Sequence, residues 1–436
     1  MEHVIGIRRE DKNEWERRAP LTPDHVRRLK EAHGVHTIVQ PSPIRVFTDD
    51  EYRAAGAQIS EDLSRARVVF AVKEIPAELF QPDTAYVFFS HTIKGQPYNM
   101  DMLRRMMEVG AHLIDYERFL DDNGRRLIFF GRYAGLAGMV ETLHAYGQKL
   151  KLQGYDTPLA RILPAWKYVS LDEARAAVKA VGDEIDANGM PMEIVPQVMG
   201  FSGYGNVSRG AQEIFDLLPH KVISADIMDV MYENFTDDNF NFYKVVFHED
   251  DMVRRKSDGG FELQEYYNHP DRYESIFNRY LPRLNVLVNC IYWTEAYPRL
   301  VTREFLRNAA ALRSNPTLQV IGDISCDIEG SIEICREATM PDAPCYTYMP
   351  AQDRFEDGVQ RLGVTVMAVD NLPCEFPGEA SQDFSDVLKE YVMPILESDF
   401  SRPIEKMDLD PVVRRALILH GGRLTEPYVY MQDFLS

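Results

Sequence analysis

The sequence lacks three features, and each absence excludes a class of protein. No apolar run among its 436 residues approaches the roughly 20 residues that span a bilayer, so no membrane-spanning helix and no membrane partner are expected. The five cysteines are odd in number and form no CxxC pair, which predicts reduced thiols and neither a disulfide scaffold nor a structural metal site. Lysines and arginines total 48 against 68 aspartates and glutamates, and this balance argues against nucleic acid as a partner because phosphate binding depends on cations.

The first ten residues, MEHVIGIRRE, also lack the apolar stretch of a secretory signal. A cytoplasmic location is therefore expected. The net charge of −20 means that an anionic small molecule would need a local cluster of arginines and lysines to overcome the general repulsion. Basic residues that the fold gathers in one place are therefore the first candidates for a site.

At this length, with 45% hydrophobic residues, the chain exceeds what one core usually supports, so two domains are expected. In the first part, apolar strand-like segments alternate with helical ones, which indicates a largely parallel sheet. Thr22 is typical of an N-cap, Pro23 of a first helical position and Gly34 of a helix stop, so a helix is predicted between them. Strands are predicted at residues 3–7, 36–40, 67–73, 85–91, 111–116 and 126–131.

A long helix is predicted at residues 131–154, where small residues precede periodic apolar ones, and its first residues are a candidate hinge. Residues 233–277 are too long, polar and aromatic for a plain connection and are expected to be an insertion, either a lid or an oligomer contact. Helical spacing at residues 381–398 predicts a last helix that returns to the first domain. A second series of strands is expected at residues 195–203, 220–226, 285–290, 318–325 and 364–370.

These elements predict an α/β protein of two doubly wound, Rossmann-like lobes with a cleft between them. Residues 1–138 and 375–436 are assigned to a substrate-binding and catalytic domain. Residues 139–374 are assigned to a dinucleotide-binding domain. The oligomeric state stays open, a homo-oligomer included.

The segment VMGFSGYGNVSRGAQEIF, residues 198–215, has the pattern of a strand, a glycine turn and a helix. Gly203 and Gly205 would let the backbone approach a pyrophosphate, and the helix that follows would direct its first amides at the phosphates. Ser208 stands where a third glycine is expected, which weakens the motif without excluding it. The predicted cofactor contacts in this turn are Gly203, Tyr204, Gly205, Asn206 and Val207.

Two acidic residues are further cofactor candidates. Asp226 ends the next predicted strand, about 20 residues on, where an acidic group binds the ribose hydroxyl of NAD. A solvated strand end explains Asp226 nearly as well. Asp323 lies in the predicted strand at residues 318–325 and belongs to the same series of strand ends.

Basic side chains fall at strand ends in the first domain. Lys73 and His91 each end a predicted strand, Lys94 follows closely, and open parallel sheets bind ligands at this edge. Arg18 and Arg126 are candidates to bind substrate, because the planar guanidinium grips carboxylates with two hydrogen bonds. Taken singly, a lysine or arginine is more often a solvated surface charge and a histidine a satisfied half-buried side chain, so the pattern alone leaves both readings open.

Several unusual blocks in this order resemble one known family, the lysine:2-oxoglutarate reductase half of the bifunctional aminoadipic semialdehyde synthases. More distant likenesses are to the lysine-forming saccharopine dehydrogenases and, in fold, to alanine dehydrogenase and transhydrogenase. The likeness runs from near residue 4 to the C-terminus. The blocks are IRREDKNEWERRAPLTPDHV, VKEIP, FFSHTIKGQ, LIDYE, FGRYAGLAGM, GYGNVSRGAQ, CIYW, CDIEGSIE and VDNLPCEFPGEAS.

The resemblance implies condensation of the ε-amine of L-lysine with 2-oxoglutarate and reduction of the imine to saccharopine, the first step of lysine degradation. The half that oxidises saccharopine has no counterpart in the sequence, so one step is expected. By the same resemblance, Lys73 and His91 are acid and base groups, and Glu117 tunes the lysine. The substrate-binding residues are then Arg18, Arg126, Lys94 and Asp370.

The resemblance implies NADP(H) as cofactor, whereas Asp226 by the ribose rule favours NAD(H). NADP(H) is the expectation, with NAD(H) left open. Three other functions also stay open. They are an NAD-dependent saccharopine dehydrogenase that forms lysine, a catalytically silent nucleotide-sensing subunit, and a reductase that joins 2-oxoglutarate to another amine such as ornithine.

Overall fold

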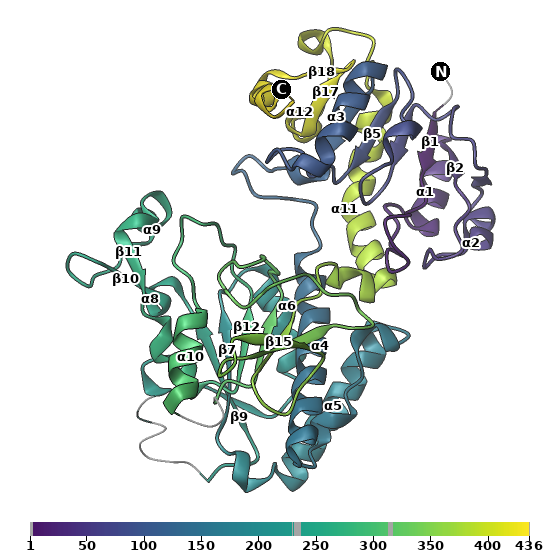
Figure 1. Cartoon of the computed structure of the whole chain (residues 1–436). Coiled ribbons are helices and arrows are strands. Elements are labelled where there is room, and N and C mark those ends of the chain that lie inside the picture. The colour runs from purple at the N-terminus through teal and green to yellow at the C-terminus, as the bar shows by residue number, and fades with distance from the viewer. Residues whose placement is uncertain (1–2, 229, 231–236, 313–316, 436) are drawn as a thin grey trace. The chain divides into compact units, whose positions relative to one another are not determined.

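The computed structural model describes residues 3–228, 230, 237–312 and 317–435. The chain forms two compact units. Unit 1 comprises Met1–Phe130 and Pro377–Ser436, and unit 2 comprises Gly131–Phe376 (Figure 1). The last helix therefore returns to the first unit, and the chain passes between the units close to the expected boundaries. Within the described ranges, no helix is long and apolar enough to cross a bilayer, and no three His, Cys, Asp or Glu side chains gather as metal ligands.

Unit 1 is built on a sheet of eight strands in the order β18-β17-β6-β5-β4-β1-β2-β3. The six strands from β6 to β3 are parallel, and β17 and β18 add an antiparallel edge. The strands are β1 (Val4–Ile7), β2 (His36–Val39), β3 (Gln58–Ile59), β4 (Val68–Phe70), β5 (Ala85–Phe88), β6 (His112–Asp115), β17 (Leu417–His420) and β18 (Arg423–Leu424). The helices are α1 (Pro23–His33), α2 (Asp49–Ala54), α3 (Pro97–Val109), α11 (Pro377–Glu397) and α12 (Pro411–Ala416).

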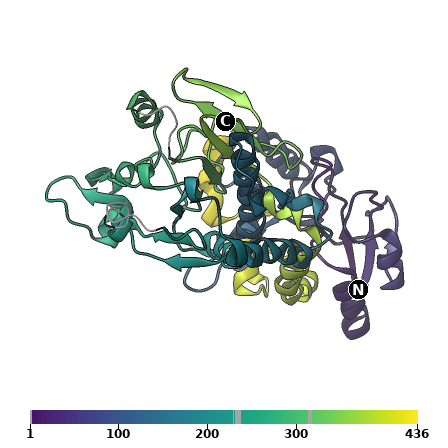
Figure 2. The same ribbon diagram turned by 90° about the horizontal axis from the view of Figure 1, so that it is seen from below.

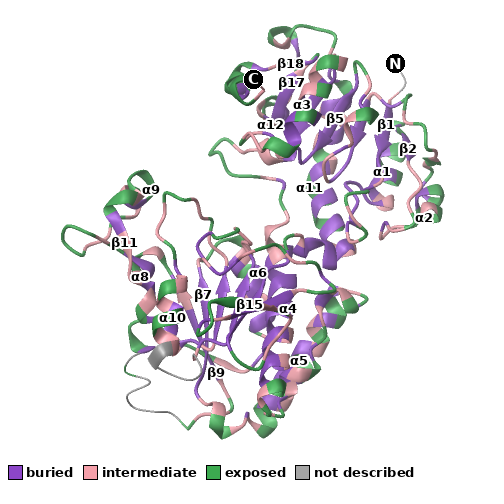
Figure 3. Ribbon diagram, in the orientation of Figure 1, coloured by how far each residue is buried: buried purple, intermediate pink, exposed green. Residues whose placement is uncertain are grey.

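Numbered along the chain, the parallel strands of unit 1 lie in the order 3-2-1-4-5-6 of a doubly wound sheet. The order reverses between β1 and β4, and ligands bind at the carboxyl ends of such a pair of strands. The central strands are buried (Figure 3). The alternating pattern of the sequence therefore leads to the expected fold, and the ends of β1 and β4 become the place to look for a site.

Helix α1 shows the predicted boundaries. The Thr22 side chain accepts a hydrogen bond from the backbone N–H of His25, and Pro23 is the first helical residue. Gly34 ends the helix with φ of 65°, a left-handed conformation that glycine adopts without steric cost.

The strand predicted at residues 126–131 is wrong. Arg126 forms one isolated bridge with Leu120, and the place beside β6 is taken by β17 from the end of the chain. Phe130 of this segment packs on α11 instead, with its ring stacked on Phe384 at 4.7 Å between centroids. Hydrophobicity alone does not distinguish a segment that covers a helix from one that joins a sheet.

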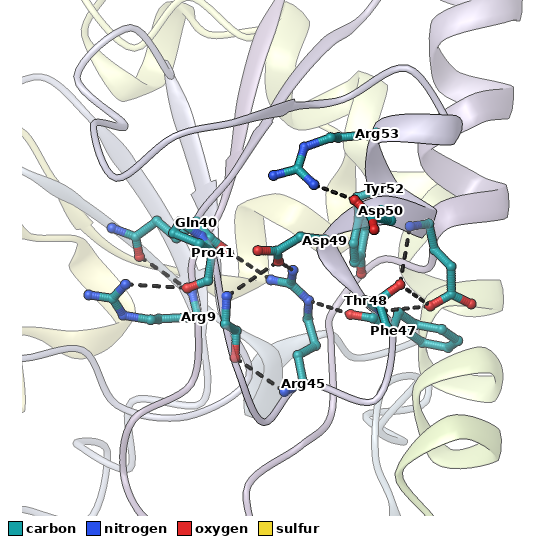
Figure 4. A network of polar contacts seen from close by, with 12 residues as sticks. Arg9, Gln40, Pro41, Arg45, Phe47, Thr48, Asp49, Asp50, Tyr52 and Arg53 are labelled. Carbon is teal, nitrogen blue, oxygen red and sulfur yellow. Dashed lines mark hydrogen bonds and ion pairs between the residues drawn. The ribbon is translucent and has the colours of Figure 1, made fainter.

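A buried arginine holds the loop between β2 and α2 (Figure 4). Arg45 donates to the carbonyl oxygens of Gln40 (2.9 Å) and Phe47 (3.0 Å) and to the Asp49 carboxylate (2.6 Å). Next to it, the N–H of Val46 donates to the carbonyl of Arg17 (2.9 Å). This loop therefore supports the segment that carries Arg18.

Unit 2 has a second sheet of eight strands, in the order β15-β14-β16-β13-β12-β7-β9-β8. The six strands from β16 to β8 are parallel, and β14 and β15 form an antiparallel edge. The strands are β7 (Gln197–Ser202), β8 (His220–Val222), β9 (Phe242–Phe247), β12 (Val286–Asn289), β13 (Val320–Asp323), β14 (Cys345–Met349), β15 (Arg354–Asp357) and β16 (Val364–Met367). The longer helices are α4 (Gly131–Gln153), α5 (Leu171–Asn188), α6 (Asn206–Phe215) and α10 (Arg303–Leu312).

Helices α4 and α6 cross at two glycines. A Cβ atom on Gly135 would lie 2.0 Å from the carbonyl oxygen of Val207, and one on Gly210 would lie 2.1 Å from the carbonyl oxygen of Arg132. Both distances are far inside van der Waals contact, so the backbones approach as closely as they do only because neither residue has a side chain. The crossing sets the position of α6 in unit 2.

The segment expected as an insertion, residues 233–277, is only partly one, and its residues 233–236 lie outside the described residues. Strand β9 belongs to the main sheet and pairs with β7 along its whole length. The part that follows contains α8 (Glu249–Met252), α9 (Leu263–Asn268) and a small antiparallel sheet of β10 (Val253–Arg255) and β11 (Tyr273–Ser275). The β10–β11 pair projects from unit 2 in both views (Figures 1 and 2).

Candidate functional site

In unit 1, Glu10 joins the two strand ends at which the sheet order reverses. It follows β1, and its carboxylate accepts the backbone N–H groups of Val72 (2.7 Å) and Lys73 (3.0 Å), which follow β4. Burial and the neighbouring charge of Glu16 raise the pKa of Glu10 to about 7, while the two hydrogen bonds act to lower it. The segment with the half-buried Lys73 is thereby fixed at the reversal point.

His91 lies beyond β5 and pairs with an acid that the sequence pattern did not single out. Its Nδ1 lies 2.7 Å from Glu74 Oε1, and Glu74 also pairs with Lys12 at 3.1 Å. Burial acts to raise the pKa of Glu74, but the hydrogen bond and charge of His91 hold it well below its ordinary value. An ionised Glu74 accepts the Nδ1 proton, which leaves Nε2 of His91 as the nitrogen that can exchange protons.

Two carboxylates lie at the end of β6, Asp115 as its last residue and Glu117 just beyond it. Asp115 is buried and accepts hydrogen bonds from the backbone N–H of Ser90 (3.1 Å), from the Ser90 hydroxyl and from the backbone N–H of Glu117 (2.7 Å). Burial and the charge of Glu117 raise the pKa of Asp115 to about 6. Glu117 in turn accepts from Arg126 Nη2 at 2.7 Å, with side-chain exposures of 12% for Glu117 and 46% for Arg126.

Arg18 is the most deeply buried of the predicted cations, with 2% exposure. Its Nε and Nη2 donate to the two oxygens of the buried Glu16 at 2.8 and 2.6 Å, and its guanidinium lies 4.2 Å from the centre of the Phe130 ring. One edge of the guanidinium is therefore occupied by a carboxylate of the protein. Lys94 lies exposed in the turn after β5.

The carboxyl edge of the unit 1 sheet thus brings together Lys73, His91, Glu117 and Arg126, with Arg18 beside them. The residues that sequence reasoning missed are their acidic partners Glu10, Glu16 and Glu74. Glu10 and Glu16 lie in the charged run REDKNEWERR between β1 and α1, and Glu74 directly follows Lys73. The charge density of the first run is the signal that could have pointed to them.

In unit 2, the glycine turn has the predicted shape. Gly203 has φ of 85° and donates its N–H to the carbonyl of Phe247 at 3.0 Å. A Cβ atom on Gly205 would meet nothing within 4 Å, and α6 begins at the next residue without a side-chain cap. The start of α6 therefore has no side-chain cap and has space beside Gly205, which fits a pyrophosphate. Ser208 is buried, and the close packing expected of a third glycine is provided by Gly210.

A buried polar chain supports this edge of the unit 2 sheet. The Ser202 hydroxyl donates to Asn289 Oδ1 at 2.8 Å, and Asn289 Nδ2 donates to Asp323 at 2.8 Å and to Ser331 at 2.9 Å. Burial raises the pKa of Asp323 to about 6, against the hydrogen bond from Asn289 that lowers it. The structure thus places Asp323 beneath the edge, at 1% exposure, where Asn289 links it to Ser202 across the ends of three strands.

The two remaining candidates are exposed. Asp370 follows β16 at the carboxyl edge of the same sheet. Asp226 follows β8, the outermost strand, and hydrogen bonding to Ser224 lowers its pKa. Because β9 lies between β8 and β7, Asp226 is two strands away from the glycine turn instead of on the neighbouring strand.

Comparison with known proteins gives consistent relatives. Residues 6–137 match the N-terminal domain of the alanine dehydrogenase/PNT family. The chain is 39% identical to the alpha-aminoadipic semialdehyde synthase of Arabidopsis thaliana over 98% of its own length and 41% of the relative. For the mitochondrial protein of the same name from Bos taurus the identity is 38%, over 98% of the chain and 47% of the relative. The chain spans less than half the length of these curated relatives.

A lysine-forming, NAD(+) saccharopine dehydrogenase of Neurospora crassa is 28% identical over 88% of both chains. Among solved structures, an L-alanine dehydrogenase has a TM-score of 0.63 at 17% identity and covers 99% of this chain and 98% of its own. A transhydrogenase from Sinorhizobium meliloti has a TM-score of 0.52 at 14% identity, with coverage of 97% and 99%. These structures confirm the predicted fold of two α/β lobes.

One expectation is corrected by these relatives. A cytoplasmic location was predicted because the first residues lack an apolar signal. The relatives from Bos taurus, Mus musculus and Rattus norvegicus are all named as mitochondrial, which contradicts that prediction. The absence of a secretory signal excludes one route only, since targeting sequences differ in composition.

Proposed function

From its similarity to the alpha-aminoadipic semialdehyde synthases over 98% of its length, we propose that the chain is the reductase of that chemistry. It condenses the ε-amine of L-lysine with the keto group of 2-oxoglutarate and reduces the imine to saccharopine. The observation that carries the proposal is the gathering of Lys73, His91 and Arg126 at the edge where doubly wound sheets bind ligands. Glu10 holds the backbone N–H of Lys73, and the side chains of His91 and Arg126 pair with Glu74 and Glu117.

The proposed chemistry first needs a neutral amine, because the lysine side chain arrives as an ammonium ion near neutral pH. His91 is suited to exchange this proton through Nε2, since Glu74 holds its Nδ1 and thereby orients the ring. Lys73 is the second proton carrier. One of the two deprotonates the amine, and the other protonates the carbinolamine oxygen as it leaves as water.

Arg126 is the proposed ligand of a 2-oxoglutarate carboxylate. Nearly half of its side chain is exposed, and Glu117 orients it through one nitrogen only. Arg18 and Lys94 remain proposed substrate ligands, although two nitrogens of Arg18 already bind Glu16. Asp370 is proposed to lie near both cofactor and substrate.

A nicotinamide dinucleotide is the cofactor supported by the dehydrogenase relatives and by the open glycine turn. Gly203, Gly205 and the first turn of α6 would hold its pyrophosphate, and the group would supply the hydride for the iminium carbon. The sequence resemblance favours NADP(H) over NAD(H) at this site.

The second candidate is the reverse reaction, an NAD-dependent release of lysine from saccharopine. It is favoured by the Neurospora crassa relative, which aligns over 88% of both chains. The reducing direction is preferred because the relatives with the higher identity, near 39%, cover almost the whole chain.

The test is an assay with purified protein and NADH or NADPH, from which lysine and 2-oxoglutarate are omitted in turn. Oxidation of the dinucleotide should require both substrates and yield saccharopine by mass. The Lys73→Met variant should turn over about 10² to 10⁴ times more slowly, the usual contribution of a positioned acid or base, while binding the dinucleotide normally. Oxidation without lysine, or an unimpaired Lys73→Met enzyme, would contradict the proposal.

A further inference from the structure

The two sheets of the chain differ in one strand position. In unit 1, β2 lies next to β1, so the second strand adjoins the first. In unit 2 the second strand, β8, lies at the edge, and the third strand, β9, pairs with the glycine-turn strand β7 over six residue pairs. In doubly wound domains the acid that binds the ribose ends the strand beside the glycine-turn strand. In unit 2 that place is the end of β9.

Glu249 occupies this place and contacts the glycine turn. Strand β9 ends at Phe247, whose carbonyl accepts the N–H of Gly203 at 3.0 Å. The Tyr204 ring of the turn stacks on His248, with 4.4 Å between ring centroids and 23° between planes. The Tyr204 hydroxyl lies 3.5 Å from Glu249 Oε1.

A second tyrosine fixes the same carboxylate. Tyr267, from α9, donates its hydroxyl to Glu249 Oε1 at 2.7 Å. Both tyrosines approach Oε1 of this half-buried side chain, so Oε2 is the oxygen suited to accept a hydroxyl of a ligand. Asp226, by contrast, is exposed beyond the edge strand.

We propose that Glu249, and not Asp226, binds the ribose hydroxyls of the dinucleotide, and that the chain therefore prefers NADH to NADPH. This inference rests on the proposed function only in taking a nicotinamide dinucleotide as the ligand. A carboxylate accepts the 2′- and 3′-hydroxyls of NADH, whereas a 2′-phosphate would place a second anion against Glu249 and the exposed Asp250. Arg209, in the first turn of α6, donates to the neutral side chain of Asn206 at 2.5 Å.

The strand order thus opposes the NADP(H) expected from the sequence resemblance. The resemblance concerns whole families, whereas charge at this one position decides between a hydroxyl and a phosphate. The sequence could not reveal it, because β9 lies in the segment interpreted as an insertion.

The test is direct binding of NADH and NADPH to the purified protein, followed by nucleotide fluorescence with no lysine or 2-oxoglutarate present. NADH should bind at least about tenfold more tightly than NADPH. The Glu249→Gln variant should bind NADH about 10 to 100 times more weakly, the usual value of a charge-assisted hydrogen bond, and NADPH more tightly. Opposite changes for the two ligands cannot come from general damage to the fold.

Two further variants complete the design. Glu193→Gln removes one exposed negative charge of unit 2 near the amino end of β7 and should leave both affinities unchanged. Asp226→Asn should retain the ratio of the two affinities. The inference is overturned if the unmodified protein prefers NADPH, or if Asp226→Asn abolishes a preference that Glu249→Gln leaves intact.

The same measurement separates this inference from the proposed function. If neither dinucleotide binds, both fail together. If NADH is preferred but is not oxidised in the presence of lysine and 2-oxoglutarate, the assignment of Glu249 stands and the proposed reaction fails.

Discussion

At the scale of single residues, the side chains of His91, Arg126 and Arg18 each lie against a carboxylate, and Glu10 holds Lys73 through its backbone N–H. Lys73 and His91 could be predicted because strands end at them, and strand ends follow from alternating hydrophobicity. The contacts of Glu10 and Glu74 could not, because loop residues have no periodicity that fixes where they point, although the charge density around Glu10 marks its segment. The contacts matter for function, since a carboxylate that accepts a hydrogen bond fixes the orientation of the group that donates it.

Arg126→Ala should raise the 2-oxoglutarate concentration needed for half-maximal turnover by about 10- to 100-fold, the value of a charge-assisted hydrogen bond. The measurement is the KM for 2-oxoglutarate at saturating lysine and dinucleotide. Arg125→Ala is the matched control, because Arg125 is 77% exposed and pairs with Asp121. A normal 2-oxoglutarate dependence of Arg126→Ala would remove this residue from the proposed site.

Two buried acids in unit 2 predict a dependence of stability on pH. Glu141, on α4, accepts the N–H of Ala165 at 2.6 Å through one oxygen, and its other oxygen has no partner in the described part of the chain. Glu375, in the short helix Leu372–Glu375, is buried with neither oxygen paired among the described residues. Burial raises the pKa of Glu141 to about 8 and that of Glu375 well above its ordinary value.

Between about pH 4.5 and pH 8, the folded state therefore holds a proton on Glu141 that the unfolded chain, with an ordinary pKa of 4.5, has already released. This contribution to stability is complete below about pH 4.5 and is lost as pH rises to about 8. The free energy of unfolding should fall across this window by up to about 1.4 kcal/mol per pH unit for this group.

Glu141→Gln should flatten that slope, because glutamine keeps the acceptor for Ala165 and cannot ionise. Denaturant unfolding at several pH values measures it. Asp186→Asn, an exposed residue of α5, should keep the slope of the unmodified protein. Identical slopes for Glu141→Gln and the unmodified chain would mean that Glu141 is ionised in the folded state.

At the scale of elements, the close crossing of α4 and α6 supports the cofactor turn. Gly210→Ala should destabilise unit 2 by about 1 to 3 kcal/mol, as overpacking does, since the new methyl group meets the backbone oxygen of Arg132. It should also weaken dinucleotide binding because α6 must shift. Gly378→Ala, in α11, is the control, since its Cβ atom would meet only Val46 at 3.7 Å.

Thermal unfolding and dinucleotide titration of both variants measure these effects. Equal stability of Gly210→Ala and Gly378→Ala would show that the two helices can separate without cost. Equal dinucleotide affinity, together with lower stability, would separate the crossing from the cofactor turn.

Elements with strong end signals were predictable, and elements defined by their neighbours were not. Helix α1 follows from Thr22 and Gly34, and α4 from its long apolar period. Two predictions failed, the strand at residues 126–131 and the assignment of β9 to an insertion. Both depend on which segment of the chain occupies a given position in a sheet. Distant parts of the chain compete for such a position, and beside β6 the strand β17 occupies it in place of residues 126–131. A local sequence pattern contains no information about this competition.

At the scale of the whole molecule, the chain has separate cores. One cluster of buried apolar residues lies wholly in unit 1, and another lies wholly in unit 2. Because each unit buries its own apolar surface, thermal unfolding should show two transitions.

A dinucleotide should stabilise only unit 2 against unfolding, by about 2.7 kcal/mol at a ligand concentration 100 times Kd. Only the melting temperature of that transition should therefore rise. Scanning calorimetry with and without NADH measures this, and Gly210→Ala identifies the transition of unit 2 by lowering it. A single transition, or a ligand shift of both, would contradict independent stability of the two units.

Strand β8 has one sheet neighbour, and that neighbour is made later. During synthesis on the ribosome, residues 220–222 emerge with nothing to pair with until residues 242–247 have followed. The glycine turn is therefore translated well before the sheet around it can close, and its nascent segment must wait in an unpaired state. A pause in translation between the codons for these two strands would lengthen that wait and expose β7 to wrong partners.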